Sequence, residues 1–291
     1  MRYQIIHTTE YKYKDVVHQS YSELRLSPNF TPHQECISCK INIFPNTRTM
    51  NSRLDFFGNL VHSFSICQPH QQLKIIAESI VELQDNKINF NFENGVSSWI
   101  EVANMFQVFD AKLLDIKQFI LDSTFVRTTN QIKSFVEPIF ISEPILLSAV
   151  KKLMNEIYTQ FEFKSGATTI STPIEEVMLS RKGVCQDFAH ITVACLRSMG
   201  LAARYVSGYI ETIPPPGIEK LVGADASHAW VSVYIPEYGW VDFDPTNNIF
   251  VNNQHITLAV GRDYEDITPV RGVVYSEGEQ EMETIVDVNR M

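Results

Sequence analysis

The stretch from Cys185 to Met199 is apolar on nearly every side of the helix that it predicts. Gly200 follows it directly, as expected where a helix ends. A helix that is apolar all round is stable only when other elements cover it. The apolar positions are Phe188, Ala189, Ile191, Thr192, Ala194, Cys195, Leu196 and Met199. This helix is therefore expected at the centre of a core.

The residues on either side of this helix indicate what covers it. Ser142-Glu143-Pro144 predicts the start of a helix that runs to about Tyr158. Thr172-Pro173-Ile174-Glu175 matches a capping box for a second helix ending at Lys182-Gly183. Alternation then predicts strands at 203–210, 228–235 and 240–244, the last two joined by a short turn. The fold class is α+β, with helices packed on an antiparallel sheet.

The first part of the chain has the period-two pattern of strands. Residues 3–13 alternate, 72–83 form another predicted strand, and Gly58-Asn59 is flanked by apolar runs that predict a type II′ hairpin. The segment 86–141 has no clean period, and we interpret it as a partly helical connection. The predicted domains are 1–85, β-rich; 86–141, connecting; and 142–291, a catalytic core with C-terminal strands.

Charge and composition exclude several classes of protein. The 291 residues carry a formal charge of −10, so no basic surface is expected for nucleic acid or an anionic membrane. Residues 1–7 lack the apolar run of a signal peptide, and no segment has the roughly 18 consecutive apolar residues of a membrane span. A cytoplasmic location is expected. The oligomeric state is not predictable.

Five cysteines are an odd and sparse set for this length, so at least one thiol is free. Cys195 lies in the apolar stripe and is expected to pack in the core. Cys36 and Cys39 have the spacing of half a metal site, but no second pair accompanies them. Neither a metal nor a cofactor is predicted.

Cys185 is the candidate nucleophile, because it stands where a buried helix begins. The free N–H groups and the partial positive charge of that end stabilise a thiolate, and the amide of Cys185 could bind the oxyanion of an attacked carbonyl. Gly183 leaves room for backbone and substrate to approach. Nucleophile and oxyanion site are thus predicted in one turn.

A cysteine nucleophile needs a base, and two histidines are candidates. His190 is five residues along the same helix, about 140° around its axis, so it is expected to face elsewhere. His228 begins a strand that must pack against the buried helix. His228 is therefore the predicted base, and His190 a core residue.

The histidine needs an orienting carboxylate. An odd-length turn between the two strands pairs Trp230 with Asp244, which places Asp244 diagonal to His228 on one face of the sheet. Asp242 lies on the same face and is its rival. Asp244 is preferred because Asp244-Pro245-Thr246 ends the strand, where a side chain can reach an open site.

These segments carry a family resemblance. Gly183-Val184-Cys185-Gln186-Asp187-Phe188-Ala189-His190, Ala203 to Tyr209, Ser227-His228-Ala229-Trp230 and Gly239 to Thr246 resemble, in order and spacing, the core motifs of bacterial transglutaminase-like proteins. The first 85 residues resemble the β-rich region that accompanies such cores. The resemblance implies a papain-like core with a Cys185–His228–Asp244 triad acting on an amide through a thioester. Such bacterial proteins are regarded as candidate cysteine proteases or amidases.

One departure favours hydrolysis over cross-linking. Animal cross-linking relatives use an upstream tryptophan at the oxyanion, and the upstream tryptophan here, Trp99, matches no motif; Tyr158 or Phe163 could shape that wall. The expected function is cysteine-dependent hydrolysis of a peptide or other amide bond. Protein-glutamine transamidation and a binding module without turnover are the alternatives. The Pro-rich loop in 212–222 is either a stiff surface loop or a rim of the substrate cleft.

Overall fold

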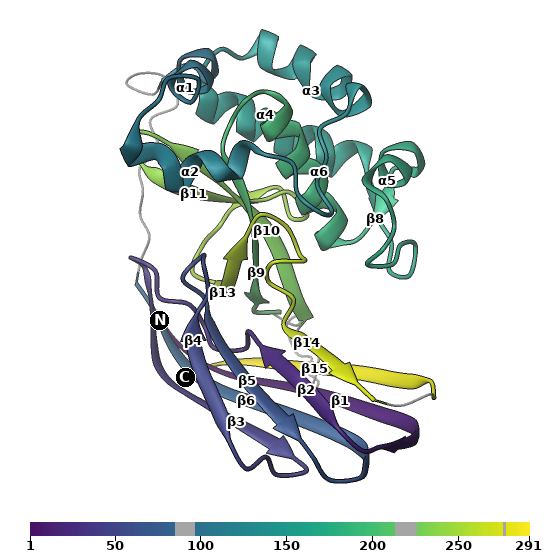
Figure 1. Ribbon diagram of the computed structural model, residues 1–291. Coiled ribbons are helices and arrows are strands. Elements are labelled where there is room, and N and C mark those ends of the chain that lie inside the picture. The colour runs from purple at the N-terminus through teal and green to yellow at the C-terminus, as the bar shows by residue number, and fades with distance from the viewer. Residues whose placement is uncertain (85–96, 213–225, 276–277) are drawn as a thin grey trace, which may run out of the picture.

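A computed structural model describes residues 1–84, 97–212, 226–275 and 278–291 (Figure 1). Helices gather at one end of the molecule and the strands of the N-terminal region at the other, with β9, β10 and β13 between them. The expected α+β class, with a strand-rich N-terminal region, is confirmed.

Two antiparallel sheets form the N-terminal region. They contain β1 (Arg2–Val17), β2 (Ser20–Leu24), β3 (Gln34–Phe44), β4 (Met50–Leu54), β5 (Leu60–Ile66) and β6 (His70–Leu83). The alternation predicted for residues 3–13 is observed, since Tyr3 and Ile5 face the core while their neighbours face outward. The predicted strand over 72–83 lies within β6.

The last two strands return to these same sheets. β15 (Gln280–Arg290) pairs with β1 to give the order β15-β1-β6-β3, and β14 (Val270–Val274) pairs with β2 to give β14-β2-β5-β4. Our prediction grouped the C-terminal strands with the segment 142–291, whereas their hydrogen bonds join them to the first region. Such long-range pairing has no local signature in the sequence. The domain limits themselves stay a prediction.

The hairpin at Gly58 differs from the predicted two-residue turn. Leu54 pairs with Leu60, so the connection has five residues, 55–59. The carboxylate of Asp55 accepts the N–H groups of Phe57 and Asn59 at 3.0 and 2.9 Å, and Gly58 has φ +83°. Because the Asp55 carboxylate binds the backbone N–H groups two and four residues later, residues 55–59 form a turn instead of extending the paired strands.

The helices cover one face of a five-stranded antiparallel sheet. In the described residues they are α1 (Trp99–Met105), α2 (Leu114–Lys117), α3 (Asn130–Ser142), α4 (Leu146–Gln160), α5 (Ile174–Ser180) and α6 (Cys185–Ser198), with 3₁₀ turns at Ala111–Leu113 and Gln118–Ile120. The sheet has the order β12-β11-β10-β9-β13, from β9 (Ala203–Ile210), β10 (Ala226–Ile235), β11 (Gly239–Asp244), β12 (Ile249–Phe250) and β13 (His255–Gly261). A short parallel pair joins β7 (Glu162–Phe163) to β8 (Lys182–Gly183).

Two predicted helix starts were wrong in detail. Ser142 is the last residue of α3, where its hydroxyl donates to the Ile139 carbonyl, and α4 begins only at Leu146. The Thr172 hydroxyl accepts the N–H of Thr169 instead of capping α5. In both places a nearby backbone group satisfies the hydroxyl first, which a local motif does not reveal.

Helix α6 is the buried centre that its composition predicted. Its apolar residues from Phe188 to Leu196 belong to the same core as Tyr205, Val231 and Val233 of the sheet. The opposite face of that sheet carries Val206, Trp230 and Val260, which are also buried. Tyr209 and Ile256, farther along the strands on the helix-covered face, join the core of the N-terminal sheets. The sheet is therefore buried on both faces, and only its edges and strand ends can carry an accessible site.

Candidate active site

Helix α6 presents Cys185 as its first residue. Val184 has an extended backbone, and its N–H donates to the carboxylate of Asp187, one turn into the helix, at 2.8 Å. The hydroxyl of Thr168 donates to the same Asp187 oxygen at 2.6 Å. Cys185 is half-buried. The start of the helix is thus pinned by a side chain, and the thiol is held in the first turn.

Gly183 is required by Asp187. A Cβ at residue 183 would stand 2.7 Å from the Asp187 carboxylate oxygen and 2.8 Å from its Cβ, too close for any side chain. Our sequence interpretation gave this room to substrate and backbone, whereas the structure shows the Asp187 side chain in it. Burial raises the pKa of Asp187, while its bonds to Thr168 and Val184 oppose that shift.

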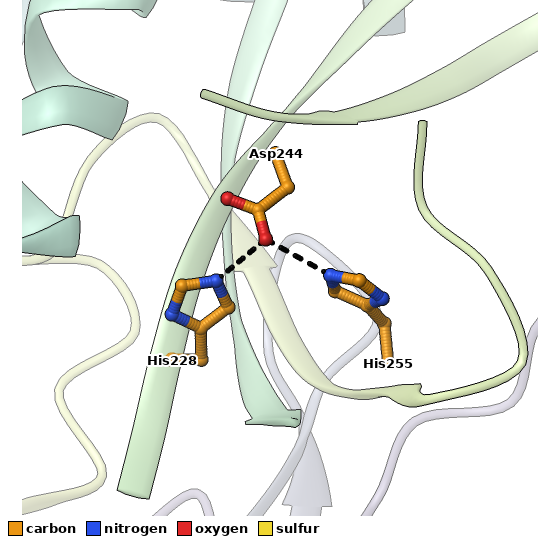
Figure 2. Close-up of side chains that lie close together, drawn as sticks. All are labelled: His228, Asp244 and His255. Carbon is orange, nitrogen blue, oxygen red and sulfur yellow. Dashed lines mark hydrogen bonds and ion pairs between the residues drawn. The ribbon is translucent and has the colours of Figure 1, made fainter. Parts of the chain in front are cut away.

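His228 and Asp244 meet at one end of neighbouring strands. Ile235 pairs with Gly239 and Val231 with Phe243, so the connection has three residues, the odd length that our prediction required. His228 Nε2 is 2.8 Å from Asp244 Oδ2 (Figure 2). The second ring nitrogen of His228 points away from Asp244.

Cys185 is the third residue of the predicted site, and it lies beside His228. It is close enough to His228 to raise the pKa of the ring, and since Nε2 is engaged with Asp244, Nδ1 is the nitrogen left for the sulfur. Burial disfavours the imidazolium and lowers the pKa of His228. The hydrogen bonds and negative charges of Asp244 and Cys185 outweigh burial and raise that pKa to about 10. A histidine in this environment can hold the proton of the thiol.

Asp244 is fully buried, and both of its oxygens accept hydrogen bonds. Oδ1 accepts the N–H groups of Thr246 and Asn247 at 3.0 and 3.2 Å. Oδ2 accepts from the Asn247 amide at 2.6 Å, in addition to His228 and His255. Burial raises the pKa of Asp244, but these donors outweigh it and hold the pKa below its ordinary value. The carboxylate therefore stays ionised as a fixed partner of the imidazole.

His255 is a member of this cluster that the sequence analysis missed. Its Nε2 lies 3.0 Å from the same Asp244 oxygen that His228 contacts. It is the first residue of β13, an apolar strand, as His228 stands near the start of β10. A histidine at the entrance of a buried strand was the available signal.

His228, Asp244 and His255 could also form the ligand set of a metal ion, since one donor atom from each lies within 4.8 Å of the others. Ligands around a tetrahedral zinc ion, at about 2.1 Å from it, stand roughly 3.4 Å apart. The two N–O distances of 2.8 and 3.0 Å are shorter and are those of hydrogen bonds. The three residues thus fit hydrogen bonding better than metal binding.

The rival carboxylate, Asp242, has a different partner. Its Oδ2 accepts the indole N–H of Trp230 at 3.1 Å. The indole packs against Gly208, where a Cβ would come within 2.4 Å of the ring. Asp242 thus fixes Trp230, while Asp244 receives His228.

His190, the other histidine considered as a base, has partners of its own away from Asp244. Its Nε2 accepts the N–H of Tyr264 at 3.2 Å, and its ring stacks on Phe125 with centroids 5.7 Å apart. Burial lowers the pKa of His190 to about 4, with Asp263 opposing that shift. A neutral, buried histidine agrees with the predicted core role.

The other cysteines lie away from this cluster. Cys195 is buried in α6, and burial raises the pKa of its thiol. Cys36 and Cys39 lie in β3, and burial, with Cys39 beside it, raises the pKa of Cys36 to about 11. In the described part of the chain, the one cluster with a metal-ligand arrangement is that of His228, Asp244 and His255.

The residues considered for the oxyanion wall lie in different places. The Trp99 indole donates to the Phe140 carbonyl at 2.9 Å, which places it among the helices. Tyr158 and Phe163 are exposed, and Phe163 is the one next to Gly183, through the β7–β8 pair. The Pro-rich loop, in 213–222, lies outside the described residues.

Two family models match the chain. The bacterial transglutaminase-like N-terminal region matches residues 3–82, and the transglutaminase-like superfamily core matches residues 133–245, which contain Cys185, His228 and Asp244. The chain therefore belongs to the transglutaminase-like superfamily, as the sequence resemblance indicated.

Similar proteins extend over both regions. An uncharacterized protein of Mycobacterium tuberculosis is 37% identical over 99% of this chain and 91% of its own length. A protein-glutamine gamma-glutamyltransferase of Pseudomonas aeruginosa is 31% identical over 36% of this chain and 16% of its own. The crystal structure of a candidate cysteine protease from Cytophaga hutchinsonii has a TM-score of 0.77, 19% identity, and covers 99% of this chain and 90% of that one. The last similarity shows that the two share a fold.

Among the described helices, none has the length and apolar character needed to cross a membrane. The cytoplasmic location stays a prediction.

Proposed function

We propose that this protein is a cysteine-dependent hydrolase of peptide or other amide bonds. The observation that carries the proposal is the order of three groups: Cys185 beside His228, whose pKa it raises, and the buried carboxylate of Asp244, bonded to His228 Nε2 at 2.8 Å. A thiol, a base and an orienting group in that order are what nucleophilic catalysis on an acyl group requires.

The first half of the proposed reaction forms an acyl-enzyme. The proton of Cys185 passes to Nδ1 of His228, and the sulfur attacks the amide carbon of the substrate. The oxyanion that forms is stabilised by the N–H of Cys185 at the start of α6. His228 then gives its proton to the amine nitrogen as the C–N bond breaks, so that an amine leaves and a thioester remains.

The second half restores the enzyme. A water molecule gives one proton to His228, and its oxygen attacks the thioester carbon. The C–S bond breaks, the carboxylic acid product leaves, and the proton returns to the sulfur. Asp244 remains ionised throughout and holds the ring by Nε2. The reaction uses neither a metal nor a cofactor.

Transamidation is the second candidate, with a substrate amine in place of the water. It is favoured by the similarity to the gamma-glutamyltransferase of Pseudomonas aeruginosa over a third of the chain. The place of Trp99 among the helices favours water, because the indole that cross-linking relatives use is not at this site in the described residues. The predicted substrate in either case is a peptide or protein amide.

The first experiment tests the reactivity of the Cys185 thiol without a substrate. Alkylation of each cysteine by iodoacetamide is followed against pH by peptide mass spectrometry, in wild type and His228→Ala, with the exposed Cys67 as internal reference. We expect Cys185 to react faster than Cys67 below pH 7, and to lose that advantage in His228→Ala. Equal rates for Cys185 in both proteins would contradict the enzyme proposal and favour a binding module.

Products then distinguish the two reactions. Incubation with a mixed peptide library should yield new amino termini or free ammonia without amine incorporation if the protein is a hydrolase. Incorporation of a labelled primary amine into glutamine side chains would instead mark a transferase. Cys185→Ala is the matched control, since it removes the sulfur and leaves the fold of α6 intact.

A further inference from the structure

His255 shares the carboxylate of Asp244 with His228. Figure 2 shows the two imidazoles on either side of one oxygen, with His228 Nε2 at 2.8 Å and His255 Nε2 at 3.0 Å from Oδ2. The side chains of Asp244 and His255 are both fully buried. A buried carboxylate that accepts from two imidazoles is a specific arrangement, because each N–H must be aimed at one lone pair.

The ring of His255 is fixed from its other side as well. Its Nδ1 lies 3.2 Å from the Asn252 side-chain oxygen and 3.4 Å from the Asn252 N–H. The Trp230 ring meets it edge-on, with centroids 5.3 Å apart. With both nitrogens engaged and an indole against its edge, the ring of His255 has little freedom to turn.

The other hydrogen bonds to the Asp244 carboxylate explain why a second imidazole matters. The N–H groups of Thr246 and Asn247 hold Oδ1 and leave the position of Oδ2 to the groups around it. The Asn247 amide, 2.6 Å from Oδ2, also lies 3.4 Å from His228 Nε2, so it stands on the His228 side. His255 is the donor on the other side, and it opposes that pull.

We propose that His255 is a positioning residue, which holds Asp244 Oδ2 where His228 Nε2 can donate to it and thereby keeps His228 Nδ1 turned to Cys185. This inference rests on the proposed function for its catalytic consequence. The orientation of His228 itself is measurable without any substrate.

Three variants separate positioning from packing. His255→Gln places an amide N–H near the position of Nε2 and should preserve the hydrogen bond to Asp244. His255→Leu fills the space without a donor, and His255→Asn is polar but too short to reach Asp244. His7→Gln, at another buried histidine, which bonds Thr9 and Tyr209, is the control for loss of a buried imidazole.

The readout is the nitrogen-15 spectrum of the His228 ring, with the rate of Cys185 alkylation at pH 6. In wild type, His255→Gln and His7→Gln we expect one ring state at pH 6, with both nitrogens protonated and the Nε2 proton bonded to Asp244. In His255→Leu and His255→Asn we expect loss of that signature and a roughly 10- to 100-fold slower alkylation, the effect of one lost hydrogen bond to a charged group.

The outcomes decide separately for the two proposals. If His255→Leu keeps the wild-type His228 spectrum, His255 is only a packing residue and the inference is wrong. If His255→Leu does not fold, the comparison of His255→Gln with His255→Asn decides in the same way. If Cys185 of the wild type reacts no faster than Cys67 while the His228 spectrum changes in His255→Leu, the proposed function fails and the positioning role stands.

Discussion

Two buried histidines of this protein stand near aspartates and have opposite properties. His228 and His190 are almost equally buried, at 8% and 6% exposure, yet the pKa of His228 is raised to about 10 and that of His190 is lowered to about 4. Burial lowers both values. The difference therefore comes from what each ring contacts.

The contacts separate them clearly. Asp244 gives an oxygen to His228 Nε2, whereas the oxygens of Asp263 accept the N–H groups of Phe125 and Glu265. The ring nitrogen of His190 itself accepts an N–H from Tyr264. An aspartate nearby does not make a base of a histidine; a carboxylate that accepts the ring proton does.

The largest expected effect is the difference in kcat/KM between variants of the two histidines. His228→Ala should lower kcat/KM for a hydrolysed peptide by about 10⁴- to 10⁶-fold, since triad members act as a unit. His190→Gln, whose amide oxygen can accept the Tyr264 N–H, should stay within about threefold of wild type once the folded fraction is equal. Steady-state kinetics with circular dichroism as the folding control test this. Comparable losses in both variants would abolish the distinction.

The next effect compares the two aspartates. Asp244→Asn should lower kcat by about 10⁴-fold, because an amide no longer fixes the tautomer of His228. Asp263→Asn should leave kcat within a few-fold and lower the free energy of unfolding by about 1–2 kcal/mol, through weaker acceptance of the Phe125 and Glu265 N–H groups. Urea unfolding and kinetics on the same preparations measure both. A catalytic loss in Asp263→Asn alone would reverse the comparison.

The pH dependence of stability should differ in sign between the rings. The neutral form of His190 is favoured by folding, so its contribution is complete above pH 6.5 and is lost as pH falls through about 4, by up to about 3 kcal/mol. His7, whose pKa burial also lowers to about 4, adds to this acid loss. For His228 the charged form is favoured, so its contribution is complete below pH 6.5 and is lost as pH rises through about 10.

Denaturant unfolding at a series of pH values measures both losses of stability, the acid limb and the alkaline limb of the plot of unfolding free energy against pH. His190→Gln should flatten the acid limb relative to wild type, and His228→Gln should flatten the alkaline limb. Each variant is the control for the other. An acid limb unchanged in His190→Gln would mean that His190 is protonated in the folded protein, contrary to its contacts.

The smallest expected effect is at the stacked ring of Phe125. Phe125→Leu removes the parallel contact with His190, and we expect a loss of about 0.5–1.5 kcal/mol of stability with an unchanged rate of Cys185 alkylation. Thermal unfolding and alkylation kinetics check the two halves. A slower alkylation in this variant would show that the environment of His190 reaches the thiol after all.

Local patterns predicted much of this protein because their physical cause is local. The apolar surroundings of Cys185 predicted a buried helix, and the odd-length turn of residues 236–238 predicted that Asp244 and His228 share a face. Period and register depend on a few neighbouring residues, so a sequence displays them directly. The helix starts at Ser142 and Thr172 failed, because other backbone partners lay within a few residues: the Ile139 carbonyl for Ser142 and the Thr169 N–H for Thr172.

What the amino-acid sequence determined by itself is the order of the elements around α6, the place of Cys185 at a helix start, and the alternation that sorts residues by face. The tertiary structure alone decided which groups meet across long separations: β15 beside β1, Asp187 in the space above Gly183, and His255 on the far side of Asp244. These contacts join residues whose spacing carries no period. They depend on how whole sheets pack, and each is held only by the three-dimensional fit of buried donors to buried acceptors.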